Sequence, residues 1–329
     1  MVCTCIPDFS GSCGHGYTSG PWASADVFGT PVPLKVRRYR LDPGARARMP
    51  PLGGTEAMAY AIAGSGTALA AGAGDESFSL APESVLWLSA CDGLTAEAGR
   101  DGLDLMVAQS TGPVPEGGFA PLRKVFAAGE LPHLVSTRDT RDRLDLVTDD
   151  TGVGARAIRA DRIVYHPGDT AAAHYHTDCH HVFCVLAGSG LLYADGIANR
   201  LEAGMSALVG PGEVHWFLND TAENFSFVEF WAPPPTGTFS VTRSRRSLVS
   251  RVDTRCGSSA AAKALRSGRK PPSGAGPVVS ATSTSSGSSP ASMVRLSHAD
   301  SHSTLSVPRV NRSPPVAGDA TAVPEPAIT

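Results

Sequence analysis

The sequence contains no run of eighteen consecutive apolar residues, although 42% of its 329 residues are hydrophobic. Because a helix needs about 20 such residues to cross a bilayer, we expect no membrane span. An excess of one charge is missing too, since 28 Lys and Arg against 31 Asp and Glu leave a net charge of −3. This balance argues against nucleic-acid and membrane partners. These absences favour a soluble protein with a small-molecule partner.

No basic segment followed by an apolar one opens the sequence, so we expect no secretion signal. The seven cysteines form an odd, irregular set, which is typical of reduced thiols, so we expect a cytoplasmic protein. Cys3, Cys5, Cys13 and His15 carry metal-binding groups. Their spacing differs from common zinc knuckles and their neighbours offer no core, so we predict no zinc site there.

Histidines are the most informative residues that are present. His174 and His176 are two positions apart, so on a β-strand they point to the same face. His215 comes thirty-four residues after His181, and a return strand can bring it opposite the pair. Imidazole suits zinc, copper, iron and nickel, and three such ligands leave coordination positions for substrate or water. The pattern predicts one metal site.

Short apolar runs separated by Gly, Pro and Asp turns fill the second half of the chain. The runs are residues 163–165, 181–186, 190–193, 205–209, 215–218 and 225–231. This punctuation, without a long amphipathic helix, predicts an all-β antiparallel sandwich or barrel. Alternation from His181 places Phe183 and Val185 on its face, and Val182 and Cys184 on the other.

The spacing of these histidines and their flanking glycines resembles the two motifs of the cupin superfamily, over roughly residues 155–235. The first motif reads Gly168-x5-His174-x-His176-x4-His181-x6-Gly188, and the second reads Gly204-x5-Gly210-Pro211-Gly212-x2-His215-x3-Asn219. Two positions depart from the family. His181 stands where the family usually carries a glutamate ligand, and Gly210 stands at the motif proline.

The resemblance implies a jelly-roll barrel, or double-stranded β-helix, in which His174, His176, His181 and His215 hold a divalent metal ion. Iron is the expected metal, with zinc, nickel or manganese as alternatives. His180 and His181 exchange roles if the loop shifts by one residue. Without the glutamate, the local charge is about +2 rather than about +1, which favours an anionic oxygen donor such as an enolate, phenolate or carboxylate.

The carboxylate-free dioxygenases of the family are similar in this respect. They imply a metal-dependent oxidoreductase of dioxygenase type, acting on a small anionic oxygen-containing molecule, and a homodimer. Two alternatives stay open: a non-redox cyclase, isomerase or lyase, and a non-catalytic binding module. The sequence assigns no catalytic residue. Proton-transfer groups on or near the expected strands belong to Tyr165, Tyr175, Tyr193 and Glu229.

Residues 34–110 read as a second copy that has lost its ligands. Matching Gly64 to Gly188 places groups that cannot hold a metal at the ligand positions: Ala57 for His181, Leu52 for His176, Pro50 for His174 and Trp87 for His215. We therefore expect tandem cupin barrels, a bicupin, with this first copy degenerate.

The expected domains are a disordered N-terminal extension (1–28), a degenerate cupin domain (29–135), a metal-binding cupin domain (136–239) and a disordered tail (240–329). The tail is rich in Ser, Pro and Arg and carries 12 Lys or Arg against four Asp or Glu. The charged run at 138–145 lies in the inter-domain connection, and we expect it to be a solvated surface.

Overall fold

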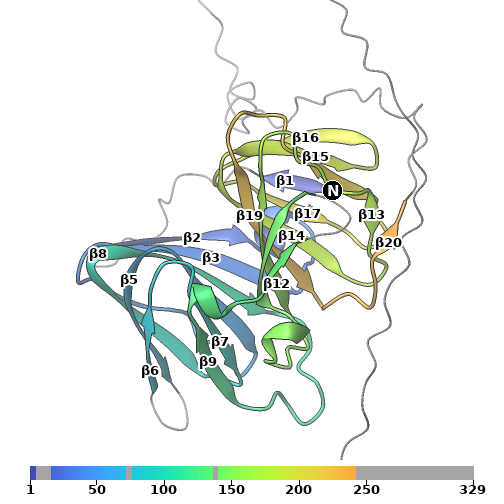
Figure 1. Ribbon diagram of the computed structural model, residues 1–329. Helices are drawn as coiled ribbons and strands as arrows, with labels where there is room; N and C mark the ends of the chain where they lie inside the picture. The colour runs from blue at the N-terminus through green and yellow to red at the C-terminus, as the bar shows by residue number, and fades with distance from the viewer. Residues whose placement is uncertain (5–15, 72–75, 136–139, 242–329) are drawn as a thin grey trace, which may run out of the picture. The chain divides into compact units, whose positions relative to one another are not determined.

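The structure, a computed structural model, describes residues 1–4, 16–71, 76–135 and 140–241 (Figure 1). Nearly all regular structure in these residues is β-strand, which confirms the all-β prediction. They include one four-residue α-helix, α1 (Ala25–Phe28), and two 3-10 helices, η1 (Ala128–Glu130) and η2 (Asp149–Thr151). No helix of the described part is long and apolar enough to cross a membrane. The predicted tail beyond residue 241 and most of the Cys3–His15 segment lie outside the described residues.

Twelve strands form the two sheets of the C-terminal half. They are β1 (Val2–Thr4), β10 (His133–Val135), β11 (Asp142–Val147), β12 (Arg159–Tyr165), β13 (His174–Tyr175), β14 (His180–Ala187), β15 (Ser189–Ala194), β16 (Ile197–Glu202), β17 (Ser206–Val209), β18 (His215–Leu218), β19 (Phe225–Ala232) and β20 (Phe239–Ser240). One sheet has the order β1-β17-β14-β19-β12-β11-β10, and the other β16-β15-β18-β13-β20. The six predicted runs coincide with β12, β14, β15, β17, β18 and β19.

Alternation along β14 decides which side chains fill the C-terminal barrel. Phe183 and Val185 pack in an interior cluster with residues of β12, β18 and β19. Val182 and Cys184 point the other way, into a larger cluster that also contains residues of the N-terminal half. Successive side chains of a strand face opposite sides of the sheet, so one strand supplies both cores. The predicted facing is confirmed.

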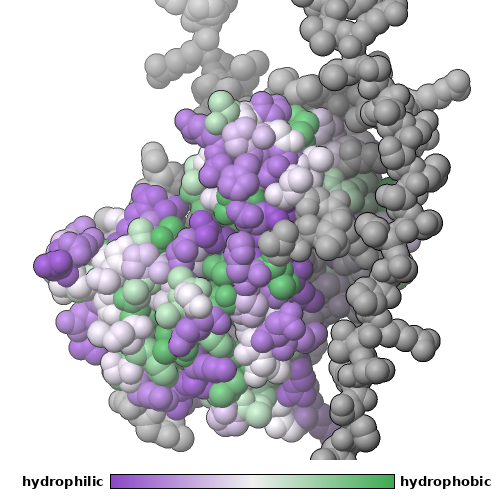
Figure 2. Space-filling model, viewed as in Figure 1, coloured by the Kyte–Doolittle hydropathy of each residue, from purple (hydrophilic) through white to green (hydrophobic). Residues whose placement is uncertain are grey.

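The N-terminal half is one eight-stranded sheet. Its strands are β2 (Tyr17–Ala23), β3 (Leu34–Leu41), β4 (Arg46–Arg48), β5 (Glu56–Ala71), β6 (Glu76–Leu80), β7 (Val85–Ser89), β8 (Gly93–Ser110) and β9 (Leu122–Phe126). The order is β2-β3-β8-β5-β7-β9, with β4 paired to β8 and β6 paired to β5. Apolar and polar residues are interspersed over the face shown in Figure 2.

The two halves repeat the same strand pairing. Ala57 lies opposite β7 and β8, as His181 lies opposite β17 and β19. Each ladder then has an irregularity at the same distance from these residues, at Ala61/Ala63 in one half and Val185/Ala187 in the other. The shared register confirms the second copy and the placement of Ala57 at the His181 position.

Two glycines at equivalent positions allow a close approach of neighbouring strands. Gly64 has φ +74°, and a Cβ there would lie 2.2 Å from the carbonyl oxygen of Gly102. Gly188 has φ +70°, and a Cβ there would lie 2.0 Å from the carbonyl oxygen of Asn224. Only glycine combines a positive φ with this contact. The match of Gly64 to Gly188, made from sequence, therefore has a structural cause.

The placement of Trp87 at the His215 position is wrong. Trp87 lies on β7, opposite Met58 of β5. Strand β7 pairs with β5 as β17 pairs with β14, so Trp87 is on the strand equivalent to β17. The strand equivalent to β18 is the first part of β8, where Leu94 pairs with Ala70 as His215 pairs with Ala194. The second motif of the N-terminal copy keeps a turn proline but has no histidine. The sequence alignment therefore placed the His215 position on β7 instead of on the first part of β8.

Two expectations about exposed segments also need correction. Parts of residues 1–28, which we expected to be disordered, are strands: β1 pairs with β17 and β2 pairs with β3. In the charged run 138–145, Asp145 is fully buried and its carboxylate contacts the Arg143 guanidinium, with Nε and Oδ1 2.6 Å apart. Residues 142–145 are therefore not a fully solvated surface, because they belong to β11, which joins the sheet beside β12.

Candidate metal centre

Three of the four predicted ligands meet at the mouth of the C-terminal barrel. His174 on β13 lies directly opposite His215 on β18, and His176 follows two positions after His174. One ring nitrogen from each of the three lies within 4.8 Å of the others. Two nitrogens bound about 2.1 Å from one ion are separated by at most about 4.2 Å. The observed spacing is therefore compatible with one shared ion after small ring rotations.

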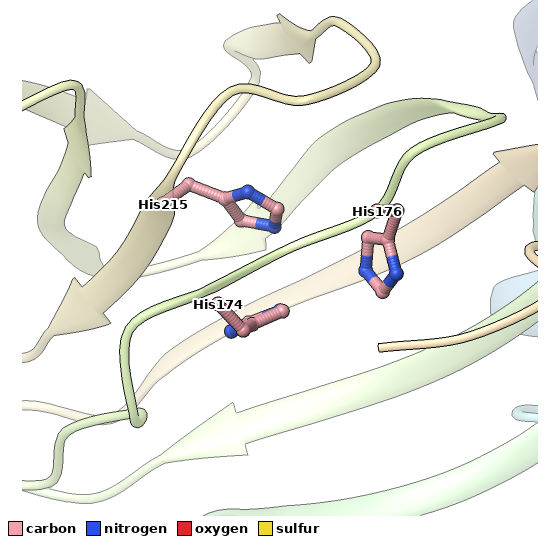
Figure 3. Close-up of side chains that lie close together, drawn as sticks. All are labelled: His174, His176 and His215. Carbon is pink, nitrogen blue, oxygen red and sulfur yellow. The ribbon is translucent and has the colours of Figure 1, made fainter. Parts of the chain in front are cut away.

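Figure 3 shows the three imidazoles turned toward one common space. Hydrogen bonds fix which nitrogen of each ring enters that space. Each Nδ1 lies near a backbone carbonyl oxygen: His174 at 2.8 Å from Ala172, His176 at 3.0 Å from Gly237 and His215 at 2.9 Å from Glu213. A carbonyl oxygen only accepts, so each Nδ1 donates and each neutral ring keeps its lone pair on Nε2. Metal-binding histidines are typically oriented by such bonds.

The surroundings also favour the neutral, metal-binding form of these rings. Burial lowers the pKa of His174 and His176, and it lowers the pKa of His181 and His215 well below the ordinary value. Neighbouring imidazoles add to the effect at His174, His181 and His215, because a second positive charge nearby disfavours protonation. The indole Nε1 of Trp231 donates to His176 Nε2 at 3.2 Å, which independently identifies that nitrogen as an acceptor.

His181 lies beside the three clustered histidines rather than among them. Its ring is buried and stacks on Trp231, with ring centroids 4.6 Å apart. Its Nδ1 is 3.1 Å from His215 Nε2, and its Nε2 is 3.2 Å from Glu229 Oε2. The fourth ligand therefore stays a prediction, while its position next to the cluster is a structural fact.

Proton positions along this chain of contacts follow from donor and acceptor rules. His215 Nε2 carries a lone pair, so His181 Nδ1 must donate to it, and His181 Nε2 is then an acceptor. Its partner Glu229 can donate only as a neutral carboxyl. Burial raises the pKa of Glu229, which agrees with a proton held on this carboxyl. Glu229, His181 and His215 thus form one hydrogen-bonded line.

A cavity of about 130 Å³ adjoins the cluster, and its charged lining contains more cationic than anionic side chains. Its charged lining comes from the three arginines Arg141, Arg143 and Arg159 and from Asp161 and Glu229. Arg143 Nε lies 2.6 Å from Asp145 Oδ1 and 3.0 Å from Asp161 Oδ2, which fixes its guanidinium. The Arg159 guanidinium lies over the Trp231 ring, 5.4 Å from its centroid.

These arginines were not predicted as site residues. Arg159 carries no local signal, because only the pairing of β12 with β19 brings it opposite Trp231. Arg141 and Arg143 did offer one: they occupy alternate positions with Asp145, which on a strand places all three on the same face. The run was interpreted as solvated because charge in a connecting segment is usually exposed.

Of the proton-transfer candidates, Glu229 lines the cavity and the tyrosines pack elsewhere. Tyr165 stacks on Phe217, with centroids 5.8 Å apart, and Tyr193 stacks on Trp216 at 4.5 Å. Tyr175 stacks on Phe239 at 5.3 Å. Among the described residues that line the cavity, Glu229 is the one member of this candidate group.

Comparisons with known proteins agree with this architecture. Residues 161–231 match the family described as the cupin domain. No curated protein matches the sequence. Lactobacillus farciminis oxalate decarboxylase in complex with formate is a similar structure, with TM-score 0.62 and 12% identity over 73% of this chain and 88% of that one.

A structure of Bacillus subtilis oxalate decarboxylase, from work on its Mn(II) centres, has TM-score 0.60 and 14% identity over 73% of this chain and 79% of that one. At this identity the likeness shows the fold. The protein therefore has the fold of a two-domain cupin, as the motifs and the repeated pairing predicted.

Proposed function

We propose that this tandem cupin is a metal-dependent enzyme whose C-terminal barrel oxidises a small organic anion, in a reaction of the dioxygenase type. The observation that carries the proposal is the convergence of one ring nitrogen each from His174, His176 and His215 beside a cavity lined by three arginines. The metal ligands by themselves indicate no substrate class, and the arginines by themselves indicate no reaction type. Because the two groups lie side by side, they support both a metal-dependent reaction and an anionic substrate.

The donor set fits a divalent transition metal. Three neutral imidazoles with fixed orientation suit iron, zinc or nickel, and His181 beside them can supply a fourth nitrogen after the His181–His215 contact opens. We propose iron as the metal. Manganese is the alternative that the Mn(II) centres of a structurally similar protein support. When bound, such an ion supplies Lewis acidity and, for iron, a redox centre.

Arginine side chains would select the substrate. Arg143 and Arg159 present guanidinium groups to the cavity, and a planar guanidinium binds a carboxylate through two parallel hydrogen bonds. Three arginines against two carboxyl groups leave the charged lining positive before any metal enters. The cavity's volume of about 130 Å³ favours a small acid as the substrate.

Glu229 is the residue that we propose as the proton donor. Its carboxyl faces both the cavity and His181 Nε2, so a proton on Oε2 can move toward a bound anion or be shared with the imidazole. A buried carboxyl with a raised pKa is well suited to general acid catalysis near neutral pH. We propose this role for Glu229 and a positioning role for His181.

A second candidate is a non-redox lyase that cleaves a carbon–carbon bond of a small acid, such as decarboxylation. Glu229 favours it, because burial raises the pKa of this carboxyl and the carbanion left by loss of carbon dioxide needs a proton. The structural likeness to oxalate decarboxylases points in the same direction.

Elemental analysis together with turnover assays tests the proposal. We expect protein produced in iron-rich medium to retain close to one iron per chain, and to consume oxygen with a hydroxybenzoate, an enolisable diketone or oxalate. His176→Ala should lose the metal, whereas His166→Ala, an exposed histidine outside the cavity, should keep it. Release of carbon dioxide without net oxygen uptake would replace oxidation by the lyase reaction. No retained transition metal under any loading condition would contradict both.

A further inference from the structure

A second cavity lies in the N-terminal barrel, the half without metal ligands. Its volume is about 370 Å³, which is larger than that of the cavity at the metal centre. Ligand pockets typically measure about 300–1,000 Å³ and combine an apolar lining with a few polar groups. Side chains of β3, β8 and the segment before β5 form most of this lining.

This cavity occupies the position of the metal centre in the other copy. On β8, Val107 and Gln109 lie opposite Ala59 and Ala57, as Glu229 and Trp231 on β19 lie opposite Phe183 and His181. The same β8 residues pair with Arg37 and Lys35, as Glu229 and Trp231 pair with Asp161 and Arg159. The register therefore makes the N-terminal cavity the counterpart of the C-terminal one.

Substitution of the ligands explains why this cavity is wider. Pro50 and Leu52 stand at the positions of His174 and His176, and all four line their respective cavities. Valine replaces Glu229, so the carboxylate and its hydrogen bonds are absent. The space that held imidazoles and a carboxyl in one barrel is thus bounded by shorter, apolar side chains in the other.

Charge within the cavity has changed as well. Where the C-terminal site has Asp161, this site has Arg37, and Lys35 stands at the place of Arg159. The Arg37 Nε is buried and has no hydrogen-bond partner among the described residues. Its Nη2 lies 3.5 Å from Ser19 Oγ, and the guanidinium also hydrogen-bonds the Tyr39 side chain. A buried guanidinium nitrogen without an acceptor costs free energy unless a ligand supplies one.

Apolar side chains line the cavity beside these cations. Met49, Leu52 and Val107 are buried, and the ring of Tyr39 has its centroid 6.0 Å from the Arg37 guanidinium carbon. Asp26 is the one acidic residue of the lining, against Lys35 and Arg37. A ligand that matches this surface has an apolar body and a single negative group.

We propose that the N-terminal barrel is a binding site for an amphipathic organic monocarboxylate, such as an aromatic acid. The carboxylate pairs with Arg37 and Lys35, and the ring or chain lies against Met49, Leu52 and Val107. Positions equivalent to metal-ligand positions in the C-terminal barrel thus line a binding pocket in the N-terminal one. This site is separate from the metal centre and independent of the reaction proposed there.

Calorimetric titration of the full metal-loaded chain with benzoate and its neutral isostere benzamide tests this inference. We expect saturable benzoate binding at least about tenfold tighter than benzamide binding, because only benzoate forms charge-assisted hydrogen bonds with Arg37. Arg37→Gln should remove this preference. Two filling variants, Val107→Phe and Pro50→Phe, should weaken both ligands, and Pro50 is exposed, so its variant should fold.

Arg46→Gln, at an exposed arginine of β4 in the same sheet, and His176→Ala should leave benzoate affinity unchanged. Retained benzoate binding in His176→Ala would show that this site is distinct from the metal centre. The result is therefore independent of the reaction proposed there. Absence of saturable benzoate binding would overturn the inference. Binding that ignores Arg37→Gln and both filling variants, or that disappears in His176→Ala, would overturn it as well.

Discussion

The Oε2 atom of Glu229 lies 3.2 Å from Nε2 of His181, and both side chains are almost completely buried. His181 Nδ1 lies 3.1 Å from His215 Nε2, so this contact joins a carboxyl at the cavity to the histidine cluster. Metal binding at His215 Nε2 requires the His181–His215 contact to open, because that nitrogen has one lone pair. The chain of contacts needs Glu229 to carry a proton, which makes the residue testable by an isosteric change.

Replacement of Glu229 by glutamine should separate hydrogen bonding from proton transfer. The amide of Glu229→Gln can still donate to His181 Nε2, so we expect metal content and folding to be retained. It cannot release a proton, so kcat should fall about 10²–10⁴-fold with little change in KM. Steady-state kinetics on metal-quantified protein measure this split. An unchanged kcat would contradict the proposed role.

Introduction of the usual family carboxylate at residue 181 should change which metal is retained. His181→Glu lowers the local charge by about one unit and adds an oxygen donor, which favours manganese over iron relative to the native site. Competitive loading with equal Mn(II) and Fe(II), followed by elemental analysis, gives the ratio. His180→Glu is the matched control, since His180 is the alternative that the sequence left open. A larger change of the Mn-to-Fe ratio in His180→Glu than in His181→Glu would indicate that His180, and not His181, lies at the family's carboxylate position.

Gly188 should be far less tolerant of alanine than a glycine in open space. In Gly188→Ala the new Cβ combines a positive φ with a 2.0 Å approach to the Asn224 carbonyl oxygen, and we expect a loss of about 3 kcal/mol in unfolding free energy. Gly196→Ala also has a positive φ, +82°, but meets nothing within 4 Å, and should cost about 1 kcal/mol. Urea denaturation compares them. Equal losses would show that the contact relaxes freely.

Glu56 connects the N-terminal sheet to the segment before β12. Its buried carboxylate accepts the backbone N–H groups of Arg156, at 2.9 Å, and Ala157, at 2.6 Å. Glu56→Ala leaves both donors unsatisfied, so we expect a loss of about 2–4 kcal/mol in unfolding free energy. Glu97→Ala, an exposed glutamate on β8, should change it by less than about 0.5 kcal/mol. A similar small effect at Glu56 would mean that water replaces the carboxylate.

Most of the site prediction came from the spacing of residues in the motifs. His174, His176 and His215 were identified as one site because strand periodicity and a turn-rich return predict their facing. Gly64 was matched to Gly188 because each begins a Gly-Ser-Gly after an apolar run, and the structure shows that both have a positive φ. Trp87 was misplaced because a strand without a ligand has no residue that anchors its register. The alternation along β14 is local, and it was predicted correctly.

The sequence by itself determined the all-β class, the duplicated barrel and the three converging histidines, since each depends on short-range periodicity and turn chemistry. Only the tertiary structure decided which groups surround them. Arg143 and Arg159 reach the cavity through the pairing of β11, β12 and β19, and Glu229 meets His181 across the β14–β19 ladder. Such contacts join residues far apart in the chain, so their register is set by packing of the whole sheet rather than by any local pattern.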